Sequence, residues 1–212
     1  MAETLRIDFE SGVTDAHGHT LTNNGVTVVS GRGYFDGADY ITTPYSKADF
    51  DWWTQDHTIE AVVEASSFAG WIDSGGRPCL IANRDTNVGI YWGFSPGPGG
   101  YLRFRFWDGV ATRIVESAIG TVPTGTPVRI AMVYTAADNM IYLLVDGEIV
   151  QSAVRPGGTP LSSETSPFLL YIGRGSGYYI TGYVDEIIIT VGEAKYIGPD
   201  DPEYSITPSD TT

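Results

Sequence analysis

The chain has 212 residues, and 26 Asp and Glu against 12 Lys and Arg give it a formal net charge of −14. This charge opposes binding to nucleic acid and to anionic lipid, because both partners would repel the protein. Its single cysteine, Cys79, excludes an internal disulfide. The sequence shows no secretory leader and no apolar run near the roughly 18 residues of a membrane span. We therefore expect a soluble protein made in the cytoplasm, without membrane insertion.

Short runs of β-branched and aromatic residues recur along the chain between clusters of Gly, Pro, Asn and Asp, without helical periodicity. This pattern predicts an all-β fold, a two-sheet antiparallel β-sandwich, at a length that such folds commonly reach as one unit. We predict one domain over residues 1–197. In chain order, the predicted strands cover residues 5–9, 26–30, 33–35, 40–42, 57–65, 78–83, 89–94, 101–107, 113–117, 127–134, 141–145, 148–152, 168–172 and 182–190.

The predicted strand 101–107 carries the clearest candidate ligand-binding residues. Its alternation points Leu102, Phe104 and Phe106 one way, and the other face is aromatic and cationic on an acidic protein. Aromatic rings stack on the apolar faces of sugars, and arginine can bind a carboxylate with two hydrogen bonds. The alternative is that these side chains only cover the sheet and form cross-strand pairs. The candidate ligand-binding residues are Tyr101, Arg103, Arg105 and Trp107.

Two Asp-Gly pairs mark turns between predicted strands. Asp146-Gly147 can supply the positive φ angles of a two-residue type I′ turn, so a tight hairpin is predicted there. At Asp108-Gly109, strict two-residue pairing would place Arg113 opposite Phe104 on the apolar face. A bulge or a longer turn is therefore expected at that position.

Three segments break the strand pattern. Residues 95–100 and 155–167 are rich in Pro, Gly and Ser, and we predict loops for both. Residues 198–212 combine prolines with acids and are predicted to form a C-terminal tail. This tail is either a flexible end or an arm that lies on a neighbouring subunit.

The last predicted strand contains two adjacent acids, Asp185 and Glu186, within a strongly β-forming run. Regular alternation would place Asp185 on the same face as Ile187 and Ile189. A carboxylate on an apolar face is costly unless a cation or backbone donors meet it. We therefore expect a fixed partner for Asp185.

A series of short motifs runs through the chain in the order Asp8-Phe9-Glu10, 15–22, 33–37, 58–60, 128–134, 142–150, 170–173 and 182–196. Together they resemble the laminin-G-like domains of the concanavalin A-like lectin/glucanase superfamily, in the form carried by bacteriophage structural proteins. The resemblance covers about residues 4–197. It implies a concanavalin A-like jelly roll.

The same resemblance implies a structural Ca²⁺ ion, because many sandwiches of this superfamily hold one between an N-terminal acid, a backbone carbonyl and an acid on the last strand. Carried over to this chain, the ligands would be Asp8 or Glu10, Asp185 and the region of Asp36. Carboxylate and carbonyl oxygens are the ligands that Ca²⁺ prefers. The alternative is that Asp185 only caps backbone amides and Asp36 only shapes a turn.

Enzymatic activity is not expected. Related hydrolases carry a Glu-x-Asp-x-x-Glu pattern, which this chain lacks. Glu60 and Glu64 lie too far apart along their strand for the chemistry of a retaining glycosidase. None of His17, His19 and His57 lies in a nucleophile motif. We expect a packing role for His57, and transition-metal binding around His17 and His19 is a weaker alternative.

From the resemblance we expect a non-enzymatic phage virion surface protein, made in the host cytoplasm, that decorates the capsid or serves as an adhesion module of the tail or neck. Its partners would be other virion proteins, and an arrangement as a homo-oligomer stays open. The alternative is a carbohydrate-binding, lectin-like module that recognises host cell-surface glycans. Both expectations rest on analogy of fold.

Overall fold

The computed structural model describes residues 3–45, 54–72, 74–77, 79–85, 89–108, 110–155, 168–175 and 177–197. It confirms the all-β prediction, since these ranges contain strands and turns and no helix. The strands are β1 (Glu3–Ile7), β2 (Thr22–Asn24), β3 (Thr27–Val29), β4 (Arg32–Asp36), β5 (Tyr40–Tyr45), β6 (His57–Glu64), β7 (Ile81–Asp85), β8 (Gly89–Gly97), β9 (Tyr101–Trp107), β10 (Thr112–Glu116), β11 (Val128–Thr135), β12 (Met140–Val145), β13 (Glu148–Val154), β14 (Phe168–Ile172) and β15 (Thr181–Val191).

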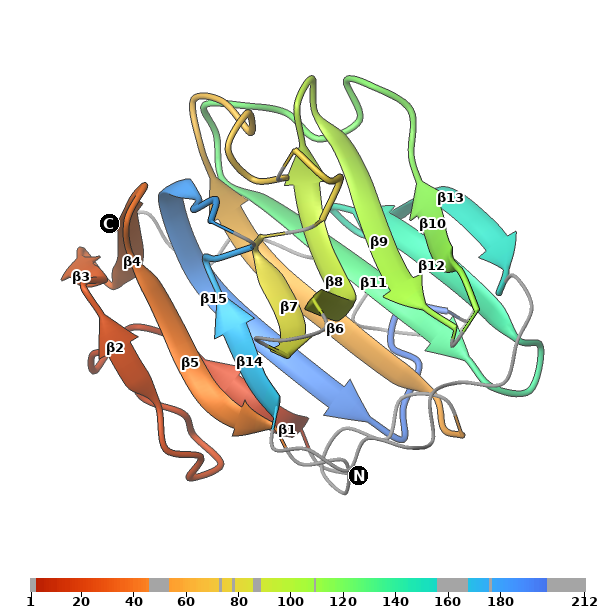
Figure 1. Cartoon of the computed structure of the whole chain (residues 1–212), viewed down its shortest axis with the longest axis horizontal. Coiled ribbons are helices and arrows are strands. Elements are labelled where there is room, and N and C mark those ends of the chain that lie inside the picture. Colours follow the sequence, from red (N-terminus) through yellow and green to blue (C-terminus); the bar gives the residue numbers. More distant parts are fainter. Residues whose placement is uncertain are drawn as a thin grey trace.

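The strands form two antiparallel sheets that are stacked as a sandwich (Figure 1). The first, called sheet A here, has the order β13-β12-β11-β6-β15-β4-β3, with β1 also paired to β15. The second, sheet B, has the order β10-β9-β8-β7-β14-β5-β2. Within the described ranges no helix is long and apolar enough to cross a membrane.

One hydrophobic core lies between the sheets, and alternation decides which side chains enter it. On β9, Leu102, Phe104 and Phe106 are at most 2% exposed, whereas the residues between them point outward. Full burial of such a side chain contributes about 1.5–3 kcal/mol. The thiol of Cys79 is buried in this core and belongs to no disulfide.

Both predictions for the Asp-Gly turns are confirmed. Asp146 and Gly147 have φ angles of 47° and 83° and join β12 to β13 in a tight hairpin. The register between β9 and β10 places Arg113 opposite Phe106, so the turn between these strands is longer than two residues, as predicted. Arg113 nevertheless stays on the side of Phe106, and its guanidinium binds Asp108 at the end of the sheet.

Two sequence-based boundaries are wrong. The short strand β2 is not predicted, because its polar residues Thr22 to Asn24 lack the β-forming signal. Residues 95–97, predicted as loop, extend β8 and pair with β9. Pairing of β8 with β7 ends at Phe94, so the missing N–H of Pro96 costs no bond to β7. The predicted tail 198–212 and most of the predicted loop 155–167 lie outside the described residues.

A β-bulge in β15 corrects the prediction for Asp185. Between Val184 and Ile187 the pairing with β6 shifts by one residue, so Asp185 and Glu186 together face a single partner position. The residues that enter the core are Val184, Ile187 and Ile189. Asp185 therefore does not share a face with the isoleucines, because the alternation that the sequence suggests is interrupted beside it.

Candidate binding face

The outer face of sheet B carries the predicted ligand-binding residues, and the structure confirms that they share one face of β9. Tyr101, Arg103 and Arg105 are half-buried, and Trp107 is 37% exposed. On the neighbouring strand β10, Ile114 lies opposite Arg105 and is 47% exposed. The face therefore presents cationic and apolar groups side by side.

Arg103 is already bound within the protein. Its Nε donates to Oε2 of Glu116 at 2.5 Å, its Nη1 donates to the carbonyl oxygen of Gly76 at 3.0 Å, and its guanidinium lies 4.9 Å from the ring centre of Tyr101. Glu116 stands directly opposite Arg103 in the ladder between β9 and β10. For this residue the cross-strand pair is what the structure shows.

The other end of β9 is more open. Arg105 donates to the carbonyl oxygen of Gly75 at 3.3 Å and to Oγ1 of Thr112 at 3.2 Å, both neutral acceptors. Trp107 lies opposite Thr112 in the ladder. This end therefore places the exposed indole of Trp107 on the same face as Arg105.

Asp108 fixes the turn that follows. Its Oδ1 accepts hydrogen bonds from the backbone N–H groups of Val110 and Ala111 at 2.8 and 2.6 Å, and its Oδ2 accepts one from Nε of Arg113 at 2.7 Å. The backbone bonds and Arg113 lower the pKa of Asp108 to about 2. The sequence marks Asp108 as a turn residue but gives no sign of this anchoring role.

A second cationic cluster on sheet B is not predicted from the sequence. Arg174 follows β14 and lies near the rings of Tyr40, Tyr171 and Tyr179. The sequence feature that points to this cluster is the glycine-rich stretch from Gly173 to Gly177, which is flanked by tyrosines. It indicates a turn, but it does not indicate which side chains pack against that turn.

The outer face of sheet A is different, because its charges neutralise one another. Arg129 donates from Nη1 to Glu60 and to Glu186, each at 3.1 Å, and Arg6 donates to the other oxygen of Glu186 at 2.9 Å. The hydroxyl of Tyr196 donates to Oε2 of Glu60 at 2.7 Å. Glu60 is 2% exposed, so this network is buried at its centre.

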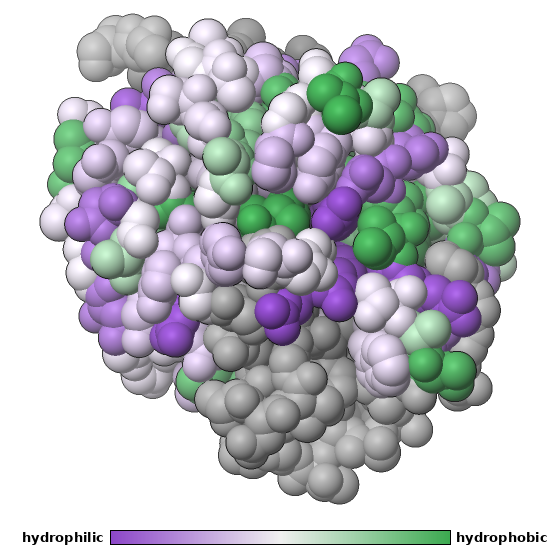
Figure 2. Space-filling view, turned by 45° about the horizontal axis from the view of Figure 1, so that its top comes forward, coloured by the Kyte–Doolittle hydropathy of each residue, from purple (hydrophilic) through white to green (hydrophobic). Residues whose placement is uncertain are grey.

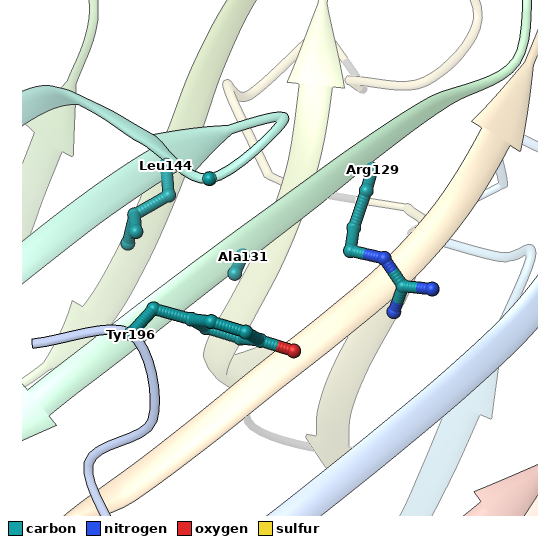
Figure 3. A pocket seen from close by; sticks show the side chains of 5 residues that line it. Arg129, Ala131, Leu144 and Tyr196 are labelled. Atoms are coloured by element: carbon teal, nitrogen blue, oxygen red, sulfur yellow. The ribbon is translucent and has the colours of Figure 1, made fainter. Parts of the chain in front are cut away.

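The segment after β15 covers this network. The backbone N–H of Lys195 donates to Oγ1 of Thr58 at 3.0 Å, and that hydroxyl donates to the carbonyl oxygen of Glu193 at 3.2 Å. Figure 3 shows the ring of Tyr196 across β11, with its hydroxyl and the guanidinium of Arg129 both reaching over β6. A shallow surface depression remains there, lined by Arg129, Ala131, Leu144, Gly147 and Tyr196.

Burial sets the proton affinities in this network. Desolvation raises the pKa of Glu60 above its usual value, although Lys195, Tyr196 and Arg129 act in the opposite direction. Burial alone would lower the pKa of Arg129, but the carboxylates of Glu60 and Glu186 outweigh it and the pKa is raised. The arginine is therefore held firmly in its charged form.

The candidate calcium ligands are spread along the sheet. Asp36 pairs with Thr181, four residues before Asp185 on β15, and its Oδ1 accepts a hydrogen bond from the N–H of Ala38 at 2.8 Å. Asp8 accepts from the N–H of Glu10 at 3.2 Å. Within the described ranges no three His, Cys, Asp or Glu side chains gather as a metal site. The predicted set combines Asp8 or Glu10 with Asp185 and the backbone near Asp36, which this observation does not test, so a calcium ion there stays a prediction.

Burial also raises the pKa of Asp185, and the neighbouring carboxylate of Glu186 adds to this effect. A bound cation would act in the opposite direction and lower that pKa. A thermal melt with and without a chelator tests the prediction, because an ion bound only by the native state must raise the unfolding midpoint.

The residues considered for catalysis have structural partners. Glu64 pairs with Arg32 at 2.5 Å, and Glu60 is enclosed by Arg129 and Tyr196. His57 is 1% exposed and stacks 5.0 Å from the ring of Tyr134, as the expected packing role requires. Neither glutamate is an open carboxylate that could act on a sugar.

Near the N-terminus, Asp15 organises a loop around the two other histidines. Its carboxylate accepts hydrogen bonds from the backbone N–H groups of Arg6, His17 and His19 and contacts Nδ1 of His19 at 2.7 Å. Burial alone would raise the pKa of Asp15, but these bonds outweigh it and the pKa is lowered. This is the arrangement of a polar turn.

The fold and these motifs agree with a comparison against protein families. The model described as concanavalin A-like lectin/glucanases superfamily matches residues 35–190, which is most of the chain. The chain belongs to this superfamily. A search of curated proteins gives no match.

Solved structures of the same fold include toxin binding domains. The binding domain of Paraclostridial Mosquitocidal Protein 1 superposes with a TM-score of 0.69 at 16% identity, over 91% of this chain and 49% of that one. The binding domain of botulinum neurotoxin DC in complex with rat synaptotagmin II gives 0.62 at 8%, over 94% and 49%. The same domain in complex with SialylT gives 0.63 at 5%, over 91% and 48%. The chain thus spans about half the length of the structures it matches, and at these identities the likeness concerns the fold alone.

Proposed function

We propose that this superfamily member is a non-enzymatic binding module displayed on the surface of a phage particle, as a capsid decoration or as a tail- or neck-associated adhesion module. The observation that carries the binding role is the end of β9, where the indole of Trp107 is 37% exposed on the same face as Arg105. The virion setting is supported by the resemblance to phage structural proteins.

The two outer faces suit a module of this kind. The charges of Arg129, Glu60 and Glu186 on the outer face of sheet A pair with one another and residues 192–197 cover them, whereas the side of sheet B exposes the aromatic rings of Trp107 and Tyr178. Figure 2 shows apolar patches interspersed with hydrophilic side chains, a mixed surface of the kind that binds polar ligands with apolar faces. Sheet B is therefore the proposed contact face, towards other virion proteins or a receptor.

The virion setting is tested by searching purified particles for this protein and locating it by electron microscopy with an antibody label. We expect the protein on the particle surface. Particles that lack it, while infected cells contain it, would contradict the virion part of the proposal and leave the binding role intact.

A lectin-like role is the second candidate, and the exposed indole of Trp107 beside Arg105 favours it, because aromatic rings stack on sugar faces. The complexes of the botulinum binding domain support both kinds of partner, a protein receptor and SialylT. A glycan array compares wild type with Trp107→Ala and with Ile149→Ala, a control residue that is 47% exposed on β13 of the other sheet. We expect only the Trp107→Ala variant to lose binding. Equal binding by all three proteins would contradict the lectin-like role.

A further inference from the structure

The hairpin after β14 holds an arginine among three tyrosine rings. Arg174 and Tyr179 form a bridge that closes the hairpin, and the N–H of Gly175 donates to the carbonyl oxygen of Tyr178 at 2.9 Å. The guanidinium carbon of Arg174 lies 4.6 Å from the ring centre of Tyr40, 5.4 Å from that of Tyr179 and 5.7 Å from that of Tyr171. Contacts of this kind hold an arginine in place and leave its positive charge uncompensated.

Arg174 differs from the arginines that form ion pairs. Its partners are rings, whereas Arg6, Arg32 and Arg129 each bind a carboxylate. Within the described residues no oxygen accepts a hydrogen bond from the side chain of Arg174, and its Nε, like that of Arg129, is a buried donor without a partner. In a protein with a net charge of −14, a cation without an anionic partner is unexpected, and an unsatisfied buried donor calls for an explanation.

The open side of the cluster points to solvent. Within the described ranges no acceptor binds the terminal nitrogens of Arg174. These nitrogens are not buried atoms without a partner, and neither are the hydroxyls of Tyr40, Tyr171 and Tyr179. Since Nε is enclosed, an incoming anion must meet the two Nη atoms. That edge fits a carboxylate, which can accept two parallel hydrogen bonds.

The surroundings favour a sugar as the carrier of that carboxylate. The three rings around the guanidinium each carry a phenolic hydroxyl, which can donate a hydrogen bond to a sugar hydroxyl and accept one from it. Tyr178, 41% exposed in the same hairpin, offers a ring for an apolar sugar face. Tyr171 lies in one row across sheet B with Ala82, Gly93 and Arg105. The tyrosine cluster is therefore on the proposed binding face. At the usual strand spacing, the backbone of Tyr171 is about 14 Å from that of Arg105.

We propose that Arg174, with Tyr40, Tyr171 and Tyr179, forms a binding site for the carboxylate of an acidic sugar, such as a uronic or sialic acid. This inference deepens the lectin-like candidate and rests on it. It also shifts the acidic-glycan role from Arg103, whose guanidinium is held by Glu116, to an arginine without such a partner.

The test titrates the protein with two sugars that differ at one group, methyl glucuronide and methyl glucoside, followed by heteronuclear NMR. Shift changes with glucuronide should centre on residues 173–180 and on Nε–H of Arg174, with affinity at least tenfold above that for glucoside. A sialic acid methyl glycoside serves as a second acidic probe. Shift changes that are equal for the two matched sugars, or that map elsewhere, would overturn the proposal.

Variants separate this site from a general charge effect. Arg174→Gln should lower glucuronide affinity about tenfold or more, and Arg174→Lys should restore it only in part, because lysine lacks the planar fork. The matched control is Arg155→Gln, which removes an arginine that lies 5.6 Å from the ring of Tyr134 and donates to Asn139. Equal losses in Arg174→Gln and Arg155→Gln would contradict the site. The NMR spectrum of each variant checks that the variant is folded, so that a loss of affinity is not mistaken for unfolding.

Tyr179→Phe keeps the ring beside Arg174 and removes one hydroxyl, so it should weaken acidic sugars several-fold without unfolding the hairpin. Unchanged affinity in this variant would show that the hydroxyl of Tyr179 does not bind the sugar. If array binding depends on Trp107 but no acidic sugar binds at Arg174, the lectin-like role stands and this inference fails. If neither occurs, both fail.

Discussion

Two arginines on the outer faces of this sandwich differ in their partners. On sheet A, Arg129 lies between Glu60 and Glu186 and is half-buried, so that these carboxylates compensate its charge. On sheet B, Arg174 is held by tyrosine rings and keeps its charge available. The comparison shows that the partner of an arginine decides whether its charge is compensated within the protein.

The largest expected effect is the loss of the arginine on the structural face. Arg129→Met leaves the carboxylate of Glu60 buried without the cation that binds it directly and should cost about 3–5 kcal/mol of unfolding free energy. Arg105→Met on sheet B removes the bonds to Gly75 and Thr112 near the surface and should cost below about 1 kcal/mol. Urea denaturation of both variants measures the difference; similar losses would remove the contrast between the faces.

The next effect concerns the segment that covers sheet A. Tyr196 is 6% exposed and packs with Ala131, Val133 and Leu144, so Tyr196→Ala should cost about 3 kcal/mol. Tyr196→Phe keeps the packing and removes only the bond to Glu60, at a cost of about 1–2 kcal/mol. The same denaturation assay applies. If Tyr196→Ala were as stable as wild type, residues 192–197 would not be a structural cover.

A smaller effect is the pH dependence that Glu60 brings to sheet A. Its pKa is raised by burial, so its contribution to stability is complete below the unfolded value of 4.5 and is lost as the pH rises through the folded pKa. Relative to Glu60→Gln, wild type should therefore become less stable as the pH increases from about 4.5. Unfolding curves of both proteins across this range give the answer; parallel curves would mean that Glu60 does not titrate.

The smallest expected effect lies beside the binding face, at Asp108. The pKa of this carboxyl is lowered to about 2, so its stabilisation is present above the unfolded value of 3.8 and is lost as the pH falls through 2. Asp108→Asn should lower the melting temperature at pH 6, and the deficit should shrink as the pH approaches 2. A deficit that does not change with pH would show that the charge of Asp108 contributes nothing to the turn.

Local patterns predicted a large part of this molecule. The alternation in 101–107 identified the inward and outward residues of β9 without error, because a paired strand alternates strictly. Asp146-Gly147 identified its hairpin, because few dipeptides adopt both positive φ angles. The bulge at Asp185 could not be read in this way, since it depends on how β15 pairs with β6.

The sequence by itself determined the fold class, the core residues of the clearest strands and the kinds of side chain that a binding face would use. Only the tertiary structure decided which arginine is neutralised and which stays available. Glu116 reaches Arg103 through the β9–β10 ladder, whereas the tyrosines around Arg174 come from two strands and a hairpin. Charge pairing depends on distance in space, and the order of residues along the chain does not contain that distance.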